Sequence, residues 1–217
     1  IGNNASFCGN NASFGGAIYA WGSMFIGNNA TFSDNAGGAI WGSIGERTIG
    51  DNATFIGNSA FSAGGAINAG NSTTIGSNAV FIRNTAASKG GAIYNPYGSM
   101  FIGNNAVFSR NAASKGGAIY TSSYLELMDC EFKTSTDTIY IFGGKMVLNG
   151  NASAAGNITI KDDLGHDYDG ELVNNGTIDF NISVRQANDG LLLNDWTKVS
   201  GGGNYAVTVS ARQSTGE

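Results

Sequence analysis

Two short motifs that recur in step constrain the fold of this chain more than any other feature. The motif Gly-Gly-Ala-Ile occurs five times, and so does a second motif, Ile-Gly-x-Asn-Ala-x-Phe-x-x-Asn. The spacing between successive Gly-Gly-Ala-Ile motifs is 22 to 27 residues. A regular period of this length indicates a solenoid, in which each repeat packs only on its neighbours. The first motif starts at Gly15, Gly37, Gly64, Gly90 and Gly116.

Within each repeat, apolar residues alternate with polar ones over short segments. Ala106 and Phe108, for example, are two positions apart, and side chains two apart on a strand share one face. The repeats lack the apolar period of a helix, and leucine is nearly absent before Leu125. These observations exclude helical repeats and leucine-rich repeats. One repeat is therefore predicted to form three short strands, such as 91–94, 99–102 and 105–108.

These strands predict an all-β fold, a right-handed parallel β-helix of roughly nine coils at about 25 residues per coil. The hand follows from the usual preference of parallel crossover connections. Equivalent residues of successive coils would lie about 4.8 Å apart. We therefore expect Phe81 to stack on Phe108, and Ile93 on Ile119, in the core.

The polar positions of the repeat also suit a coiled chain. Each Gly-Gly pair permits positive φ and close backbone approach at a sharp bend. The asparagine that closes each second motif is expected at the end of a strand, in the left-handed conformation, with its amide bonded to the copy one coil away. These residues are Asn10, Asn35, Asn58, Asn84 and Asn111.

A change of composition near residue 123 predicts a boundary. Residues 1–123 carry a net charge of +2 and residues 124–217 a net charge of −7, which together give −5. Residues 124–217 lack the two motifs but keep short β-rich runs. We expect 1–123 to form the repeat β-helix and 124–217 to continue it with a different consensus. Hairpins at Asn149-Gly150, Asn175-Gly176 and Asp189-Gly190 are the alternative.

Charge and cysteine content exclude several function classes. Neither part of the chain has the dense basic field that nucleic acid binding requires. No apolar run is long enough for a membrane helix, so no membrane span is expected. Cys8 and Cys130 show no metal-binding or redox spacing, and we expect two buried thiols without a disulfide.

The dense alternation of Gly-Gly-Ala-Ile with Phe-x-x-Asn resembles the chlamydial polymorphic membrane proteins and, more broadly, β-helical autotransporter passengers of Gram-negative bacteria. Residues 1–123 carry this resemblance, through tetrapeptides such as Phe55-Ile-Gly-Asn58 and Phe108-Ser-Arg-Asn111. The resemblance implies extracellular display on the surface of a Gram-negative bacterium, attached to the outer membrane. Because the chain opens on Ile1 inside a repeat, we expect it to be part of a longer protein.

One acidic segment is the strongest candidate for chemistry. Residues 161–171 contain His166, the sole histidine, together with Asp162 and Asp163. Carbohydrate-active enzymes with a β-helix fold use aspartate clusters, but these must converge from neighbouring coils. Asp167 and the alternating acids after it would also suit a Ca²⁺ loop, yet the full spacing of a calcium motif is missing. A solvated acidic turn is the preferred interpretation, so no catalytic residue, metal ligand or cofactor is predicted.

The residues that follow each Gly-Gly-Ala-Ile motif are candidates for a binding surface. If the isoleucine faces the core, the next residue faces outward. Four of the five outward residues are aromatic, and stacked coils would align them in an exposed stripe suited to sugar rings or a protein partner. The alternative is that neighbouring rings only support each other. The stripe consists of Tyr19, Trp41, Tyr94 and Tyr120, with Asn68 as the one interruption.

Together these features predict a non-enzymatic surface passenger. It would act as an adhesin for a host or neighbouring-cell surface protein or glycan, or as a rigid stalk, because a solenoid gains length without a larger core. Two alternatives remain open at this point, a carbohydrate-active β-helix enzyme and a self-associating structural filament.

Overall fold

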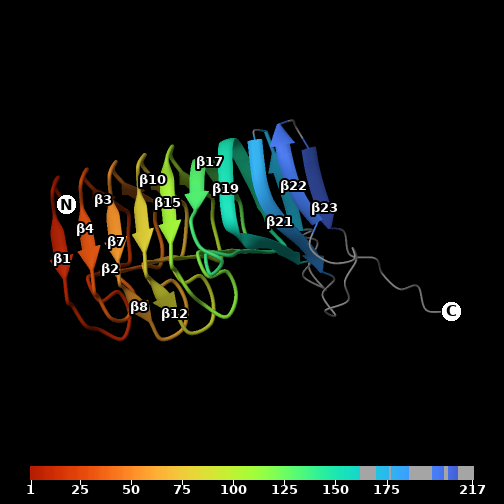
Figure 1. The fold of residues 1–217 in the computed structure, drawn as a ribbon. Coiled ribbons are helices and arrows are strands. Elements are labelled where there is room, and N and C mark those ends of the chain that lie inside the picture. The colour runs from red at the N-terminus through yellow and green to blue at the C-terminus, as the bar shows by residue number, and fades with distance from the viewer. Residues whose placement is uncertain (162–169, 176, 186–196, 203–204, 210–217) are drawn as a thin grey trace.

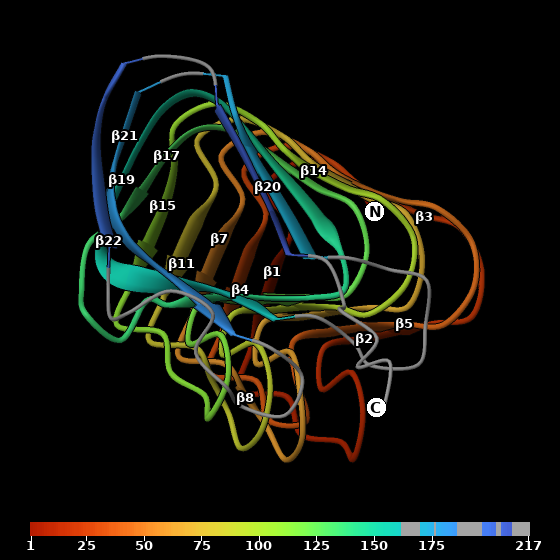
Figure 2. The ribbon, with the colours of Figure 1, turned by 90° about the vertical axis from the view of Figure 1, so that its right-hand side faces the viewer.

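The computed structural model describes residues 1–161, 170–175, 177–185, 197–202 and 205–209, and every regular element in them is a β-strand. The strands lie side by side along one axis, with β1 at one end and β23 at the other (Figure 1). Viewed along that axis, the chain winds around a three-sided tube (Figure 2). The parallel β-solenoid predicted from the repeats is thereby confirmed.

Three parallel ladders form the sides of the tube. One side, called here the GGAI face, contains the five Ile strands of the first motif and one strand that continues their ladder. The five are β2 (Ile18–Ala20), β5 (Ile40–Gly42), β9 (Ile67–Ala69), β13 (Ile93–Asn95) and β16 (Ile119–Thr121), and the sixth is β18 (Ile139–Phe142). The second side, the middle face, contains β3 (Met24–Ile26), β6 (Arg47–Ile49), β10 (Thr73–Ile75) and β14 (Met100–Ile102). The third side, the Phe face, contains β1 (Ser6–Cys8), β4 (Thr31–Ser33), β7 (Thr54–Ile56), β11 (Val80–Ile82) and β15 (Ala106–Ser109).

Longer strands follow residue 123 and bend around the corners of the tube. Parallel pairing continues through β17 (Leu125–Phe132), β19 (Lys145–Lys161), β20 (Gly170–Asn174) and β21 (Thr177–Arg185). Asn149-Gly150 lies inside β19, which pairs in parallel with β17, so the hairpin alternative is wrong there. The final strands, β22 (Thr197–Gly202) and β23 (Tyr205–Val209), pair antiparallel with β21 and β20.

The solenoid has about six turns rather than the roughly nine that the sequence predicted. The estimate of nine assumed that every residue belongs to a coil of constant length. The antiparallel strands β22 and β23 add no further parallel rung to the tube.

The core is built from columns of identical side chains. Six phenylalanines stack along the Phe face with ring centroids 4.7 to 5.0 Å apart. Phe81 lies on Phe108 at 4.8 Å, and Ile93 pairs in register with Ile119, as predicted. These four side chains are fully buried. The column consists of Phe7, Phe32, Phe55, Phe81, Phe108 and Phe132.

A buried asparagine ladder follows the Phe column at the end of these strands. The Nδ2 of Asn58 donates to Oδ1 of Asn84 at 2.9 Å, and the same oxygen accepts the main-chain N–H of Asn58 at 3.1 Å. The predicted ladder is confirmed, but the expected left-handed conformation of its asparagines is wrong. The residue before each one has positive φ instead, for example Arg83 before Asn84. That bend turns the asparagine side chain inward, where its amide reaches the next turn.

The glycine pairs allow both the sharp bend and the close backbone approach that the sequence predicted. Gly90 has a φ of 58°, and a Cβ on Gly91 would overlap the carbonyl oxygen of Gly117 in the next turn. Gly90 therefore provides the bend, whereas Gly91 permits the close approach of two turns.

Arg47 is a charged side chain that lies inside the tube. Arg47 on β6 is 1% exposed, and its Nη1 donates to the carbonyl oxygen of Asn71 at 3.4 Å. Its Nε and Nη2 have no hydrogen-bond partner among the described residues. Burial lowers the pKa of the guanidinium. The register places Arg47 between Met24 and Thr73, so it occupies a core position of the repeat.

Candidate binding surface

The aromatic stripe begins with two stacked rings on the outside of the GGAI face. Tyr19 on β2 and Trp41 on β5 lie 4.7 Å apart with their ring planes at 6°. Tyr19 is 44% exposed, and Trp41 is half-buried. Because Ile18 and Ile40 face the core, strand alternation directs the aromatic side chains outward. This part of the stripe is accessible to a partner.

The other end of the stripe is covered. Tyr94 is half-buried and tilts against Tyr120 at 5.5 Å, and Tyr120 stacks on Tyr140 at 5.4 Å. The Nζ of Lys89 lies 4.9 Å from the ring centroid of Tyr120 and 5.8 Å from that of Tyr94. Tyr120 is only 3% exposed, so its expected accessibility is wrong. Desolvation raises the pKa of Tyr94, with a smaller contribution from Tyr97.

Loops between the Phe face and the GGAI face form a wall beside the stripe (Figure 2). The short strands β8 (Ser59–Ala60) and β12 (Thr85–Ala86) join the loops of two successive turns in a parallel pair. The second turn has almost no loop, because a single residue separates Asn35 from Gly37. In the third turn five residues separate Asn58 from Gly64. The wall is therefore interrupted beside Trp41.

A groove of about 280 Å³ opens at this interruption. Phe14, from the loop of the first turn, and Phe61, from the loop of the third, both line the groove and are well exposed. Phe14 also tilts against Trp41 with ring centroids 5.8 Å apart. The groove is lined by residues of the loops (Ser13, Phe14, Gly37, Ala60, Phe61, Ser62, Ala63, Ser88 and Lys89) and of the GGAI face (Trp41, Asn68 and Tyr94).

Comparison with known proteins identifies the repeat. Residues 78–96 and 100–122 match the family model of the Chlamydia polymorphic membrane protein repeat. These two segments are therefore similar to the Chlamydia polymorphic membrane protein repeat. Searches of curated proteins and of solved structures found no match.

The two segments that match this family model coincide with part of the candidate surface. The first matched segment runs from the Phe face through β12 to β13 and contains Lys89 and Tyr94. The second runs from β14 to β16 and contains Lys115 and Tyr120. The matched segments thus supply the rings of Tyr94 and Tyr120 together with Lys89, whose Nζ lies over both rings. Lys115 lies 5.5 Å from the ring of Tyr140.

The groove is not among the sites predicted from the sequence, although the spacing of the motifs contains a signal for it. Three residues of the groove, Phe14, Phe61 and Lys89, lie outside the two motifs. Their position beside the aromatic stripe therefore could not be read from the motifs. The 22-residue step from Gly15 to Gly37 marks the shortened second turn. Only the folded arrangement shows that this short step opens the loop wall.

The remaining sequence candidates fall outside this surface. Asp162, Asp163, His166 and Asp167 lie outside the described residues. Within the described residues, no group of three or more His, Cys, Asp or Glu side chains could hold a metal ion. None of the described segments forms a helix long and apolar enough to cross a membrane.

Both cysteines are free. Cys130 is buried as expected, but Cys8 is exposed, which corrects the expectation of two buried thiols. The reason is strand alternation on β1, where Phe7 packs against the core and its neighbour Cys8 faces outward.

Proposed function

We propose that this chain is a surface-displayed, non-enzymatic β-helical passenger that acts as an adhesin on a Gram-negative bacterium. The repeat and the β-solenoid together fit such a passenger. The name of the matched repeat, a polymorphic membrane protein repeat, supports a location at the outer membrane or cell surface. The partner would be a protein or glycan on a host or neighbouring cell.

The exposed stack of Tyr19 on Trp41 is the observation that carries the adhesin proposal. Stacked rings present large apolar faces at low cost in side-chain entropy, and aromatic residues dominate binding energy at interfaces. Phe14 and Phe61 add further exposed rings beside them. No such cluster is needed for packing, because the core columns are already complete inside the tube.

The uninterrupted Phe column favours a second role, that of a rigid stalk. Six rings stack with nearly constant spacing, and every turn is bonded to the next by parallel ladders. A tube of this kind holds a binding region at a fixed distance from its attachment point. The two roles are compatible in one molecule.

Cell adhesion of beads coated with the full chain tests the adhesin role. We expect Tyr19→Ser combined with Trp41→Ser to weaken attachment to cultured epithelial cells by about thirtyfold in affinity, because truncating an aromatic hot spot costs about 2 kcal/mol. Tyr97→Ser is the matched control, since Tyr97 is 70% exposed but outside the stripe. Equal adhesion of both variants and the unmodified chain would exclude the stripe as the adhesive surface and leave the stalk role.

A further inference from the structure

The aromatic stripe contains a gap one ring wide at Asn68. Asn68 lies between Trp41 and Tyr94 in the parallel ladder. It pairs in register with Trp41 on one neighbouring strand and with Tyr94 on the other. Trp41 and Tyr94 are therefore two rungs apart, about 9.6 Å. Tyr19 covers one face of Trp41 at 4.7 Å, so the other face of the indole is directed toward the Asn68 rung. One additional ring at the same spacing fits between Trp41 and Tyr94.

This Asn68 gap opens into the groove rather than being filled by neighbours. Asn68 and both flanking rings line the groove, which measures about 280 Å³. Phe61, in the loop of the same turn, is 80% exposed and so does not occupy the gap. The missing loop of the second turn gives access from the side of Gly37.

The polar groups around the gap define the chemistry of its occupant. The side-chain amide of Asn68 makes no hydrogen bond to any residue that the structure describes, so its donors and its acceptor are available. Lys89 lies beside Tyr94 and is the one charged residue that lines the groove. The groove lining contains no carboxylate, so a ligand with a negative charge is favoured there.

We propose that the Asn68 gap binds one pyranose ring of an acidic glycan, a sugar that carries a carboxylate. The apolar face of the sugar would pack on the free face of Trp41, its hydroxyl groups would bond to the Asn68 amide, and its carboxylate would pair with Lys89. An inserted aromatic side chain of a protein would instead leave the Asn68 amide unpaired at the floor of the gap. The inference rests on the proposed adhesin function and names its ligand class.

The decisive variant fills the Asn68 gap with an aromatic side chain introduced at position 68. Asn68→Tyr restores the aromatic residue that four of the five repeats carry at this position, so the fold is retained. Thr74→Tyr is the matched control, because Thr74 is an exposed residue of the same turn on the middle face. The probes are sialyllactose, lactose as its neutral counterpart, and hexaglutamate, titrated calorimetrically into the full chain.

We expect the unmodified chain and Thr74→Tyr to bind sialyllactose, and Asn68→Tyr to lose this binding. Lys89→Gln should weaken sialyllactose binding by about tenfold, the loss expected for one charge-assisted hydrogen bond, without changing the response to lactose. Equal binding of sialyllactose by Asn68→Tyr and the unmodified chain would overturn the proposal, as would equal affinity for lactose. Binding of hexaglutamate alone would assign the groove to an acidic peptide and would also overturn it.

A cell-adhesion measurement separates this proposal from the adhesin function. If Asn68→Tyr attaches to cells as well as the unmodified chain does, and sialyllactose does not bind either protein, the glycan site is wrong while the adhesin proposal stands. If beads coated with the unmodified chain do not attach to cells, the adhesin proposal itself fails, whatever the calorimetry shows.

Discussion

Asn111 donates both its main-chain N–H and its side-chain amide to the same oxygen of Asp137, at 2.8 and 3.0 Å. Asp137 thereby ends the buried asparagine ladder, at the position where a sixth asparagine would otherwise stand. Its second oxygen accepts the main-chain N–H groups of Arg110 and Thr134 at 2.9 and 3.0 Å. An asparagine at position 137 would place its amide N–H₂ group against two N–H donors. The Asp137 carboxylate instead accepts a hydrogen bond from every one of these donors.

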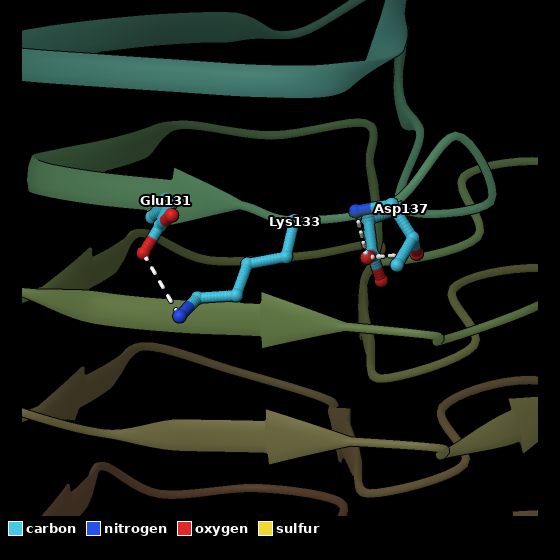
Figure 3. A network of polar contacts seen from close by, with 4 residues as sticks. Glu131, Lys133 and Asp137 are labelled. Carbon is cyan, nitrogen blue, oxygen red and sulfur yellow. Dashed lines mark hydrogen bonds and ion pairs between the residues drawn. The ribbon is translucent and has the colours of Figure 1, made fainter.

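Asp137→Asn should therefore destabilise the chain by about 1–3 kcal/mol, the cost of leaving buried donors unpaired. Glu131→Gln makes the same chemical change on the exposed ion pair with Lys133, where we expect an effect below about 0.5 kcal/mol. Figure 3 shows the two carboxylates on neighbouring parts of the same segment. Urea unfolding of both variants measures the difference, and equal stabilities would contradict the role of Asp137 as the ladder's final acceptor.

The Phe column gives a second prediction. Phe81→Ala should cost about 3–5 kcal/mol, because it opens a large cavity between Phe55 and Phe108 and removes two stacking contacts. Phe101→Ala is the control, since Phe101 faces outward on the middle face and is 37% exposed. We expect a loss below about 1 kcal/mol there. A similar loss of unfolding free energy in both variants would argue against the observed register.

The sequence was sufficient to predict the fold because identical residues recur at the same position of every turn. Once Phe81 and Phe108 are aligned by their motifs, parallel pairing determines that they stack, and Ile93 and Ile119 follow from the same alignment. The asparagine ladder was predictable for the same reason. The number of turns was not, because it depends on loop lengths and on how the chain pairs after the motifs end.

The candidate surface was only partly predictable. Alternation along β16 correctly directs Tyr120 away from the core. Its ring is covered by Tyr94 and Tyr140 and by Lys89, which reaches over it from the loop of the preceding turn. Likewise, the interruption at Asn68 is visible in the sequence, whereas the groove beside it requires the missing loop next to Gly37. Such relationships between loops and strands of different turns are set by packing rather than by the motif.

The two thiols should differ in reactivity. Burial, together with the neighbouring Asp129 carboxylate, raises the pKa of Cys130 to about 12. At about pH 8, near the ordinary thiol pKa, iodoacetamide should modify exposed Cys8 in the folded chain and reach Cys130 only after unfolding. Peptide mapping by mass spectrometry measures both sites, and equally fast alkylation of Cys130 in the folded chain would contradict its burial.

The raised pKa of Cys130 also predicts a change of stability with pH. The folded state holds the thiol proton more tightly than the unfolded state, so this contribution is fully present below about pH 8.5. It is lost as the pH rises toward about 12. Over that range the free energy of unfolding should fall more steeply for the unmodified chain than for Cys130→Ala.

Arg47→Met should stabilise the chain by about 1–3 kcal/mol, because it replaces a buried charge with two unpaired nitrogen atoms by an apolar side chain. The repeat already places Met24 at the equivalent position of the preceding turn. Arg83→Met is the control for loss of an arginine at the surface and should change stability by less than about 0.5 kcal/mol.

A substitution at Gly42 tests the position of the Arg47 side chain directly. A Cβ on Gly42 would overlap Nε of Arg47, although the register partners of Gly42 in the adjacent turns are Ala20 and Ala69. Gly42→Ala should therefore destabilise the unmodified chain but be tolerated once Arg47 is methionine. A double-mutant cycle by urea unfolding should give a coupling of about 1–3 kcal/mol. Additive effects would mean that Arg47 does not occupy the space left by the absent side chain of Gly42.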